Sequence, residues 1–197
     1  MFVLKTLEDK IRLDPKDLGR PTEEAVLSEI ERRYLDKVIL NVGLAITIYD
    51  LVELEQGHVH HSDGGAHHRV VFRLVMFAPF VDEVLKVRVL SQDPEVGIRA
   101  SVGFFHDVVV PPYAIPEPHM WVENERTWCW ELEGQPLYIE TGGQLRLKVS
   151  GVRYSAQLVG DALEEAADGE HRVMEVTGKV DGQGLGMVHW YEALAEE

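Results

Sequence analysis

The 197-residue sequence lacks the features that mark a secreted or membrane-inserted protein. It has one cysteine, Cys129, so no internal disulfide can form and a reducing compartment suits the chain. No apolar run reaches the length of a membrane span, and the start, MFVLKTLEDK, has too short an apolar block for a secretory signal. We therefore expect a soluble intracellular protein that makes no membrane contact.

Sequence signatures of catalysis are missing as well. The chain has no P-loop, nucleophile elbow, zinc-protease helix or carboxylate cluster. The run GQGLG at Gly182–Gly186 is not a dinucleotide fingerprint, because its third glycine comes one residue early and no helix is expected after it. Cys129 has no identifiable histidine partner, which favours a packed thiol over a nucleophile. We expect a non-catalytic chain without a cofactor.

Cations are scarce and unevenly placed. The chain has 19 Lys and Arg against 34 Asp and Glu, a net charge of −15. Residues 1–79 hold 10 Lys and Arg against 13 Asp and Glu, a net charge of −3, which leaves a net charge of −12 for residues 80–197. Because nucleic-acid affinity rests largely on neutralising phosphates, the second part should bind RNA or DNA weakly alone, through a local patch. A basic partner would suit it better.

The first part of the chain has the pattern of an α+β domain. Residues 2–13 are expected to form a strand, and residues 23–36 an amphipathic helix with Thr22 as its N-cap. The almost continuously apolar run Val38–Tyr49 predicts one long buried strand that ends at Asp50.

A hairpin is expected next, with its turn at residues 62–65 and its return strand at Arg69–Ala78. Pro79 is the natural boundary, so we predict an N-terminal α+β domain at residues 1–79, in which one helix covers one sheet.

The second part, residues 80–197, reads as a barrel of short strands. Val84–Leu90 alternates small apolar residues with cations, and Val96–Val102 and Val108–Val110 follow as two further strands. Three consecutive antiparallel strands of this kind predict a small all-β barrel of the oligonucleotide-binding (OB) type. Further strands are expected at Thr127–Leu132, Leu145–Val149 and Val173–Val180, with a closing strand within 182–191 and loops at 113–126 and 161–170.

Several polar and aromatic groups permit two interpretations each. Outward-facing cations on the barrel strands form either an RNA patch or simply a solvated face. Of the adjacent Phe104 and Phe105, at most one can face outward from a regular strand. Trp128 and Trp130 either stack bases or pack in the interior. The candidate RNA-binding residues are Lys86, Arg88, Arg99, Phe104, Phe105, Arg146 and Lys148.

Five of the nine histidines gather near the expected hairpin. Imidazoles from two adjacent strands could bind a metal ion, but no cysteine or carboxylate stands at a recognisable ligand spacing. We therefore expect a solvated docking loop rather than a metal site. The histidines are His58, His60, His61, His67 and His68.

Motifs along the whole chain resemble the larger stalk subunits of RNA polymerases I, II and III and of archaea, most closely those of polymerase III. They are MFVL at the start, NVGL at 41–44, SDGGAHH at 62–68, FRLVMFAPFVDEVL at 72–85, VGFFHDVVVPP at 102–112, TWCWE at 127–131 and GLGMVHWY at 184–191.

The resemblance implies a tip domain that docks on the polymerase III core beside the clamp, followed by an OB-fold. It also implies a smaller helical stalk subunit as heterodimer partner, a barrel that meets nascent RNA and initiation factors, and a nuclear location. The rivals are a free-standing OB-fold RNA-binding protein and a histidine-rich metalloenzyme. By resemblance the docking loops are 14–21 and 62–68, represented by Asp14, Pro15, Gly19, Arg20, Pro21, Asp63, Gly64 and Gly65.

Overall fold

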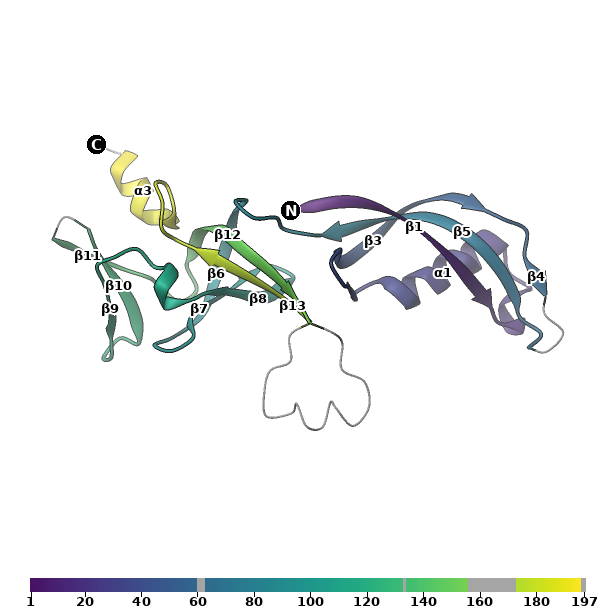
Figure 1. Ribbon diagram of the computed structural model, residues 1–197, viewed down its shortest axis with the longest axis horizontal. Coiled ribbons are helices and arrows are strands. Elements are labelled where there is room, and N and C mark those ends of the chain that lie inside the picture. The colour runs from purple at the N-terminus through teal and green to yellow at the C-terminus, as the bar shows by residue number, and fades with distance from the viewer. Residues whose placement is uncertain (60–62, 133, 156–172, 196–197) are drawn as a thin grey trace. The chain divides into compact units, whose positions relative to one another are not determined.

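The chain divides into two compact units, unit 1 at Met1–Ala78 and unit 2 at Pro79–Glu197 (Figure 1). The structure, a computed structural model, describes residues 1–59, 63–132, 134–155 and 173–195. The acidic segment 161–170, expected to be a loop, lies outside the described residues.

Unit 1 is built on an antiparallel sheet with the order β1-β5-β3-β2. Strand β1 pairs with β5 along its whole length, from Phe2 opposite Phe77 to Leu13 opposite Ala66. This register gives the first strand the bounds expected from the sequence. The strands are β1 (Phe2–Leu13), β2 (Val38–Ile39), β3 (Gly43–Leu54), β4 (His58–Val59) and β5 (Ala66–Phe77).

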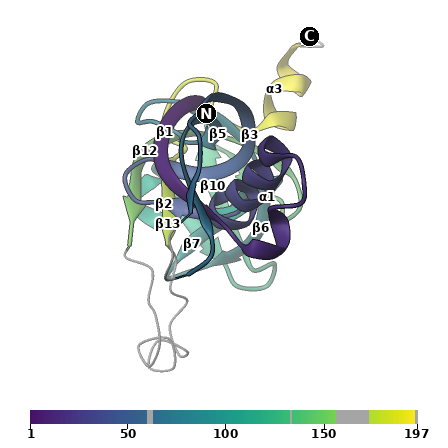
Figure 2. The ribbon, with the colours of Figure 1, turned by 90° about the vertical axis from the view of Figure 1, so that its right-hand side faces the viewer.

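One helix, α1 (Thr22–Tyr34), covers one face of this sheet, as Figure 2 shows. Val26 and Ile30 are completely buried in a core shared with the strands. Burial of two such side chains contributes about 1.5–3 kcal/mol each. The N-cap prediction was wrong, because the Ala25 N–H donates to the carbonyl of Pro21, which makes Pro21 the N-cap and Thr22 the first helical residue.

The prediction of one strand over Val38–Tyr49 was also wrong. The chain reverses between β2 and β3, with Asn41 at a φ of 59° and Gly43 at 137°, and the two strands pair antiparallel. Strand β3 then continues past Asp50 to Leu54. Asparagine and glycine are the residues that tolerate the positive φ of such a turn. The prediction rested on hydrophobicity, which does not report this tolerance, and so it missed the turn.

The expected hairpin is described only in part, because residues 60–62 lie outside the described residues. Strand β4 has two residues, with His58 opposite His67, while β5 begins at Ala66 and finds its long partners in β1 and β3. Long-range pairing therefore replaces most of the local pairing that the turn residues indicated.

Unit 2 contains a closed five-stranded barrel. Strands β6, β7 and β8 form an antiparallel meander, as expected, and β12 pairs with β6. Strand β13 closes the circle by pairing antiparallel with β12 and parallel with β8. This arrangement is consistent with an OB-fold. The strands are β6 (Val84–Asp93), β7 (Gly97–Val102), β8 (Phe105–Val110), β12 (Gln144–Tyr154) and β13 (Met174–Lys179).

A small sheet with the order β11-β10-β9 is inserted between β8 and β12. The prediction of a loop at residues 113–126 was wrong. This stretch includes the last residues of the 3₁₀ helix η2 (Pro112–Ala114) and the whole of β9 (His119–Val122). Strand β10 (Thr127–Leu132) matches its prediction and pairs with both β9 and β11 (Gln135–Tyr138).

The closing strand expected within 182–191 is only two residues long. Strand β14 (Gly186–Met187) pairs with β12, and helix α3 (Val188–Ala195) begins directly after it. The expectation that no helix follows the glycine run was therefore wrong, because Val188–Ala195 carries alanine, leucine and glutamate, which are good helix formers. None of the helices in the described ranges is long and apolar enough to cross a membrane.

Two glycines at opposite ends of β7 provide a test of the barrel geometry. Gly97 has a φ of 92°, and a Cβ there would lie 2.2 Å from the carbonyl oxygen of Val110, whereas Gly103 has a φ of 59° and open space around it. Gly103→Ala should cost about 1 kcal/mol of unfolding free energy. Gly97→Ala should cost about 3 kcal/mol, since the clash adds to the backbone strain. Urea denaturation measures both, and equal losses would contradict the register at this position.

Candidate nucleic-acid interface and docking loops

The five predicted cations lie on the outer face of strands β12, β6 and β7. Leu85 and Val87 point into the barrel, so the alternating Lys86 and Arg88 point outward. Lys86 stands opposite Arg146 on β12, and Arg88 stands opposite Ser101 on β7. Lys148 continues the row on β12, and Arg99 lies two residues from Ser101 on the same face of β7. We call these five cations the basic strip.

Acidic and backbone groups already engage part of the basic strip. Lys148 lies 2.8 Å from the carboxylate of Asp82, and Arg88 Nε donates to the carbonyl of Gly142 at 3.1 Å. The hydrogen bond from Lys148 lowers the pKa of Asp82, helped by its charge and that of Lys179. An RNA phosphate would therefore compete with Asp82 for Lys148.

A depression surrounds Arg88, which lies between Lys86 and Arg99 in the strip. Lys86, Ser101, Gly103 and Gly142 line it together with Arg88. A second depression shares Arg88, Ser101, Gly103 and Gly142, and adds the side chains of His106 and Thr141. The two hollows together present cationic, hydroxyl and imidazole groups along the start of β12 and the β7–β8 turn.

The two candidate phenylalanines differ in exposure. This agrees with the expectation that at most one of two adjacent residues faces outward. Phe104 is 47% exposed in the turn after β7, whereas Phe105 is only 6% exposed. Only Phe104 can present a ring face to a base. Trp128, at 6% exposure, also packs in the interior, with its ring 5.5 Å from that of Trp121.

Sequence reasoning missed two groups that belong to this surface. Lys179 on β13 stands opposite Lys148 on β12, and His106 lines one of the hollows at Arg88. The alternation of the fifth predicted strand could have revealed Lys179, because Val176, Gly178 and Val180 are buried and the positions between them are partly exposed. No local signal marks His106.

The two predicted docking loops meet at Arg12, which the sequence did not single out. Its guanidinium hydrogen-bonds Asp14 in the first loop, and its Nε donates to Asp63 in the second loop at 2.9 Å. Gly64 lies close to the ring of Pro15, since a Cβ on this glycine would stand 3.7 Å from the Pro15 Cγ. The side chain of Arg12 therefore joins two loops separated by about fifty residues of sequence.

Asp63 is the most strongly perturbed carboxyl group of these loops. The hydrogen bond from Arg12 holds its pKa well below the usual range, and His67 and the N–H of Gly65 add to the effect. Hydrogen bonds to Asp63 and Asp14 raise the pKa of Arg12 in turn. Because the folded pKa of Asp63 is lowered, its contribution to stability is present at neutral pH and disappears as the pH falls below about 4.

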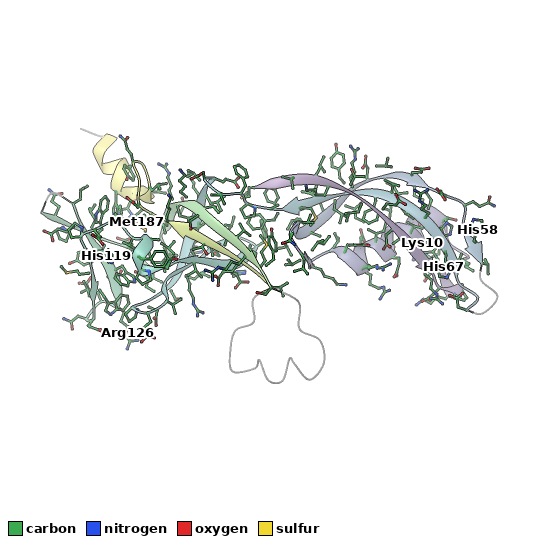
Figure 3. All side chains as sticks on the ribbon, in the orientation of Figure 1. Lys10, His58, His67, His119, Arg126 and Met187 are labelled. Carbon is green, nitrogen blue, oxygen red and sulfur yellow. The ribbon has the colours of Figure 1, made fainter. Side chains whose placement is uncertain are left out.

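His67 and His68 have separate partners. His58 and His67 lie on the neighbouring strands β4 and β5 (Figure 3), His67 Nε2 lies 3.0 Å from Asp63, and His68 Nδ1 lies 3.1 Å from the carbonyl of Glu55. His60 and His61 lie outside the described residues. Within the described part of the chain, no three His, Cys, Asp or Glu residues come together in an arrangement that could hold a metal ion.

Comparison with known proteins identifies the family of both units. Residues 83–191 match the family described as RNA polymerase III subunit Rpc25. Residues 8–64 match the SHS2 domain found in the N terminus of Rpb7p/Rpc25p/MJ0397. The chain thus has the domain pair of a polymerase subunit, with an SHS2 domain followed by a barrel. It belongs to the RNA polymerase III subunit Rpc25 family, which confirms the resemblance inferred from its motifs.

Individual relatives agree with this assignment. The chain is 32% identical to DNA-directed RNA polymerase III subunit RPC8 of Bos taurus over 202 residues, which cover 97% of this chain and 98% of that protein. It is 37% identical to rpc8 of Dictyostelium discoideum over 158 residues, covering 80% of this chain and 62% of that protein. The archaeal subunit Rpo7 of Saccharolobus solfataricus is 30% identical over 103 residues, 52% of this chain and 57% of that protein.

Removal of Arg12 should relax the ionisation of Asp63. In the Arg12→Gln variant the pKa of Asp63 should move closer to the ordinary value of about 3.9. The NMR signal of its carboxyl carbon, followed during an acid titration, measures this pKa. The hydrogen bond from the Gly65 N–H should still hold the pKa of Asp63 somewhat below that value. Arg73→Gln, which removes an ion pair with Asp50 elsewhere in the same sheet, is the matched control and should leave Asp63 unchanged. An unchanged Asp63 in Arg12→Gln would refute the proposed link between the loops.

Proposed function

We propose that this chain is the larger, non-catalytic stalk subunit of nuclear RNA polymerase III and acts in transcription initiation. The observation that carries the proposal is the match to subunit RPC8 of Bos taurus over nearly the full length of both chains. The large subunits of the enzyme would supply the chemistry, while this chain positions the stalk and presents the OB-type barrel to RNA or initiation factors.

Unit 1 would dock on the polymerase core through loops 14–21 and 62–68. The supporting geometry is the bridge from Arg12 to Asp14 and Asp63, which holds the two loops as one surface. Such fixed loops lose little conformational entropy on docking, so more of the contact energy is available for binding. A smaller helical subunit would complete the stalk as heterodimer partner.

The basic strip would contact emerging RNA. Lys86, Arg146 and Arg88 are brought side by side by the register of β6 and β12, and Phe104 adds an exposed ring close to Gly103. The strip is short and unit 2 is strongly acidic, so its affinity for free RNA is expected to be low. Within the polymerase the enzyme itself would bring the transcript to the strip, and weak contacts then suffice.

Affinity purification tests the assembly. The tagged chain should recover the large polymerase III subunits and one small helical partner at moderate salt. Arg12→Gln should lower recovery of the large subunits by about tenfold, since the docking loops lose their connection. Arg73→Gln is the control and should behave as wild type. Recovery of RNA or ribosomal proteins without polymerase would instead support a free-standing OB-fold RNA-binding protein.

Crosslinking of nascent RNA tests the basic strip separately. The double variant Lys86→Glu with Arg88→Glu should reduce RNA crosslinks to this chain in the assembled polymerase. In binding assays on the stalk heterodimer, each lost phosphate contact should lower the salt slope by about 0.7. Arg126→Glu, a single charge reversal of the same kind in the exposed β9–β10 turn, should have no effect. Unchanged crosslinking in the double variant would remove the strip from the RNA path.

A further inference from the structure

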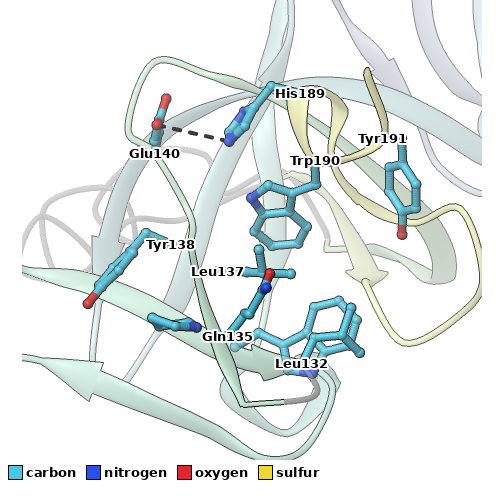
Figure 4. Close-up of a pocket in the computed structure, with 10 residues that line it drawn as sticks. Leu132, Gln135, Leu137, Tyr138, Glu140, His189, Trp190 and Tyr191 are labelled. Carbon is cyan, nitrogen blue, oxygen red and sulfur yellow. Dashed lines mark ion pairs between the residues drawn. The ribbon is translucent and has the colours of Figure 1, made fainter. Parts of the chain in front are cut away.

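A cleft of about 610 Å³ lies within unit 2, between the inserted sheet and helix α3 (Figure 4). Trp130 and Leu137 on the hairpin and Trp190 on α3 line it, and the two indole rings touch with their centroids 5.9 Å apart. Leu132 and Tyr138 at its border are 42% and 38% exposed. The lining is therefore mostly aromatic and aliphatic, and it is open to solvent.

The walls of the cleft are held by specific contacts. Gly186 has a φ of 116°, and a Cβ there would lie 2.5 Å from the ring of Trp190, so the indole packs directly on the glycine backbone. Tyr191 follows Trp190 in the chain. Its hydroxyl donates to the carbonyl of Leu185 at 2.6 Å and so fixes the first turn of α3. These contacts show that the cleft is preformed, which lowers the cost of binding a ligand.

An open strand edge borders the cleft. Strand β11 ends the order β11-β10-β9, and among the described strands it pairs with β10 only. All four of its residues line the cleft. Since neighbouring residues of a strand point to opposite faces, the cleft must extend around the edge of β11. An extended chain could pair with this edge, as peptides do when they add a strand to a sheet.

The polar groups of the cleft favour a cationic ligand. Figure 4 shows Glu140 and His189 at one end, and Leu132 at the other. The carboxylate of Glu140 lies 4.0 Å from His189 Nε2 and remains 67% exposed. Among the described lining residues there is no lysine or arginine. The exposed carboxylate of Glu140 would therefore attract a lysine or arginine side chain.

We propose that this cleft binds an extended peptide segment of a partner protein. The segment would place a bulky apolar side chain against Trp130, Leu137 and Trp190, direct a nearby lysine or arginine to Glu140, and pair its backbone with β11. The site uses none of the residues of the basic strip or of the docking loops. It goes beyond the proposed function, because it adds a peptide-binding surface that is independent of RNA and of core docking.

Charge also argues against a second copy of the chain as the occupant. Each copy carries a net charge of −15, and the cleft itself holds the acidic Glu140, so two copies would repel one another at this surface. Like charges at an interface oppose association.

Selection of random peptides displayed on phage against the full chain tests the proposal. The enriched peptides should share a bulky apolar residue with a lysine or arginine close by in sequence. Their affinity, measured by fluorescence anisotropy, should fall by about tenfold in Leu132→Ser and in Glu140→Lys. Glu95→Lys makes the same charge change in the exposed β6–β7 turn and should bind like wild type.

Four results would overturn the proposal. They are the absence of any enriched peptide, equal binding by all three variants, binding of a short oligouridine that Leu132→Ser abolishes, and self-association in sedimentation that Leu132→Ser or Glu140→Lys abolishes. The variants replace exposed side chains, and thermal denaturation of each confirms that it is folded before binding is measured. The double variant Lys86→Glu with Arg88→Glu should keep peptide binding, so failure of the RNA proposal and failure of this one can be told apart.

Discussion

Closure of the five-stranded sheet determines what unit 2 presents to its surroundings. The parallel pairing of Val176 with Val108 joins the last barrel strand to the third, and the barrel is left without a free edge. Each strand then has one face in the core and one in solvent. Once Leu85 and Val87 occupy the interior, Lys86 and Arg88 can only face outward. The basic strip is thus a direct consequence of barrel closure.

Strands with a period-two pattern could be predicted from the sequence because their signal is local. The strand from Phe2 and the cations of β6 and β12 are examples. Arg12 could not be predicted, since its role depends on Asp63, which is 51 residues away and becomes a neighbour only through the pairing of β1 with β5. The turn at Asn41 and the helix after Gly186 were missed for a different reason, because apolar composition alone does not distinguish a buried strand from a turn or a short helix.

The acidity of unit 2 limits what its basic strip can do. Asp82 holds Lys148 at one end, and at the other end the charge of Arg99 helps to lower the pKa of Asp93, after the hydrogen bonds from the backbone of Val96 and Glu95. A strip bounded by carboxylates cannot attract RNA from a distance as a long basic groove does. It can contact RNA that is already held nearby, which is the situation that the proposed stalk position would create.

The inserted sheet allows one small unit to carry two surfaces of opposite chemistry. The cations belong to β6, β7 and β12, whereas the aromatic cleft is built from β10, β11 and α3. The cleft requires Gly186, because only a residue without a side chain lets Trp190 lie on the backbone before α3 begins. A ligand at Glu140 and an RNA phosphate at Arg88 would therefore bind on either side of residues 140–142, and the different charges of the two surfaces would favour a different ligand at each.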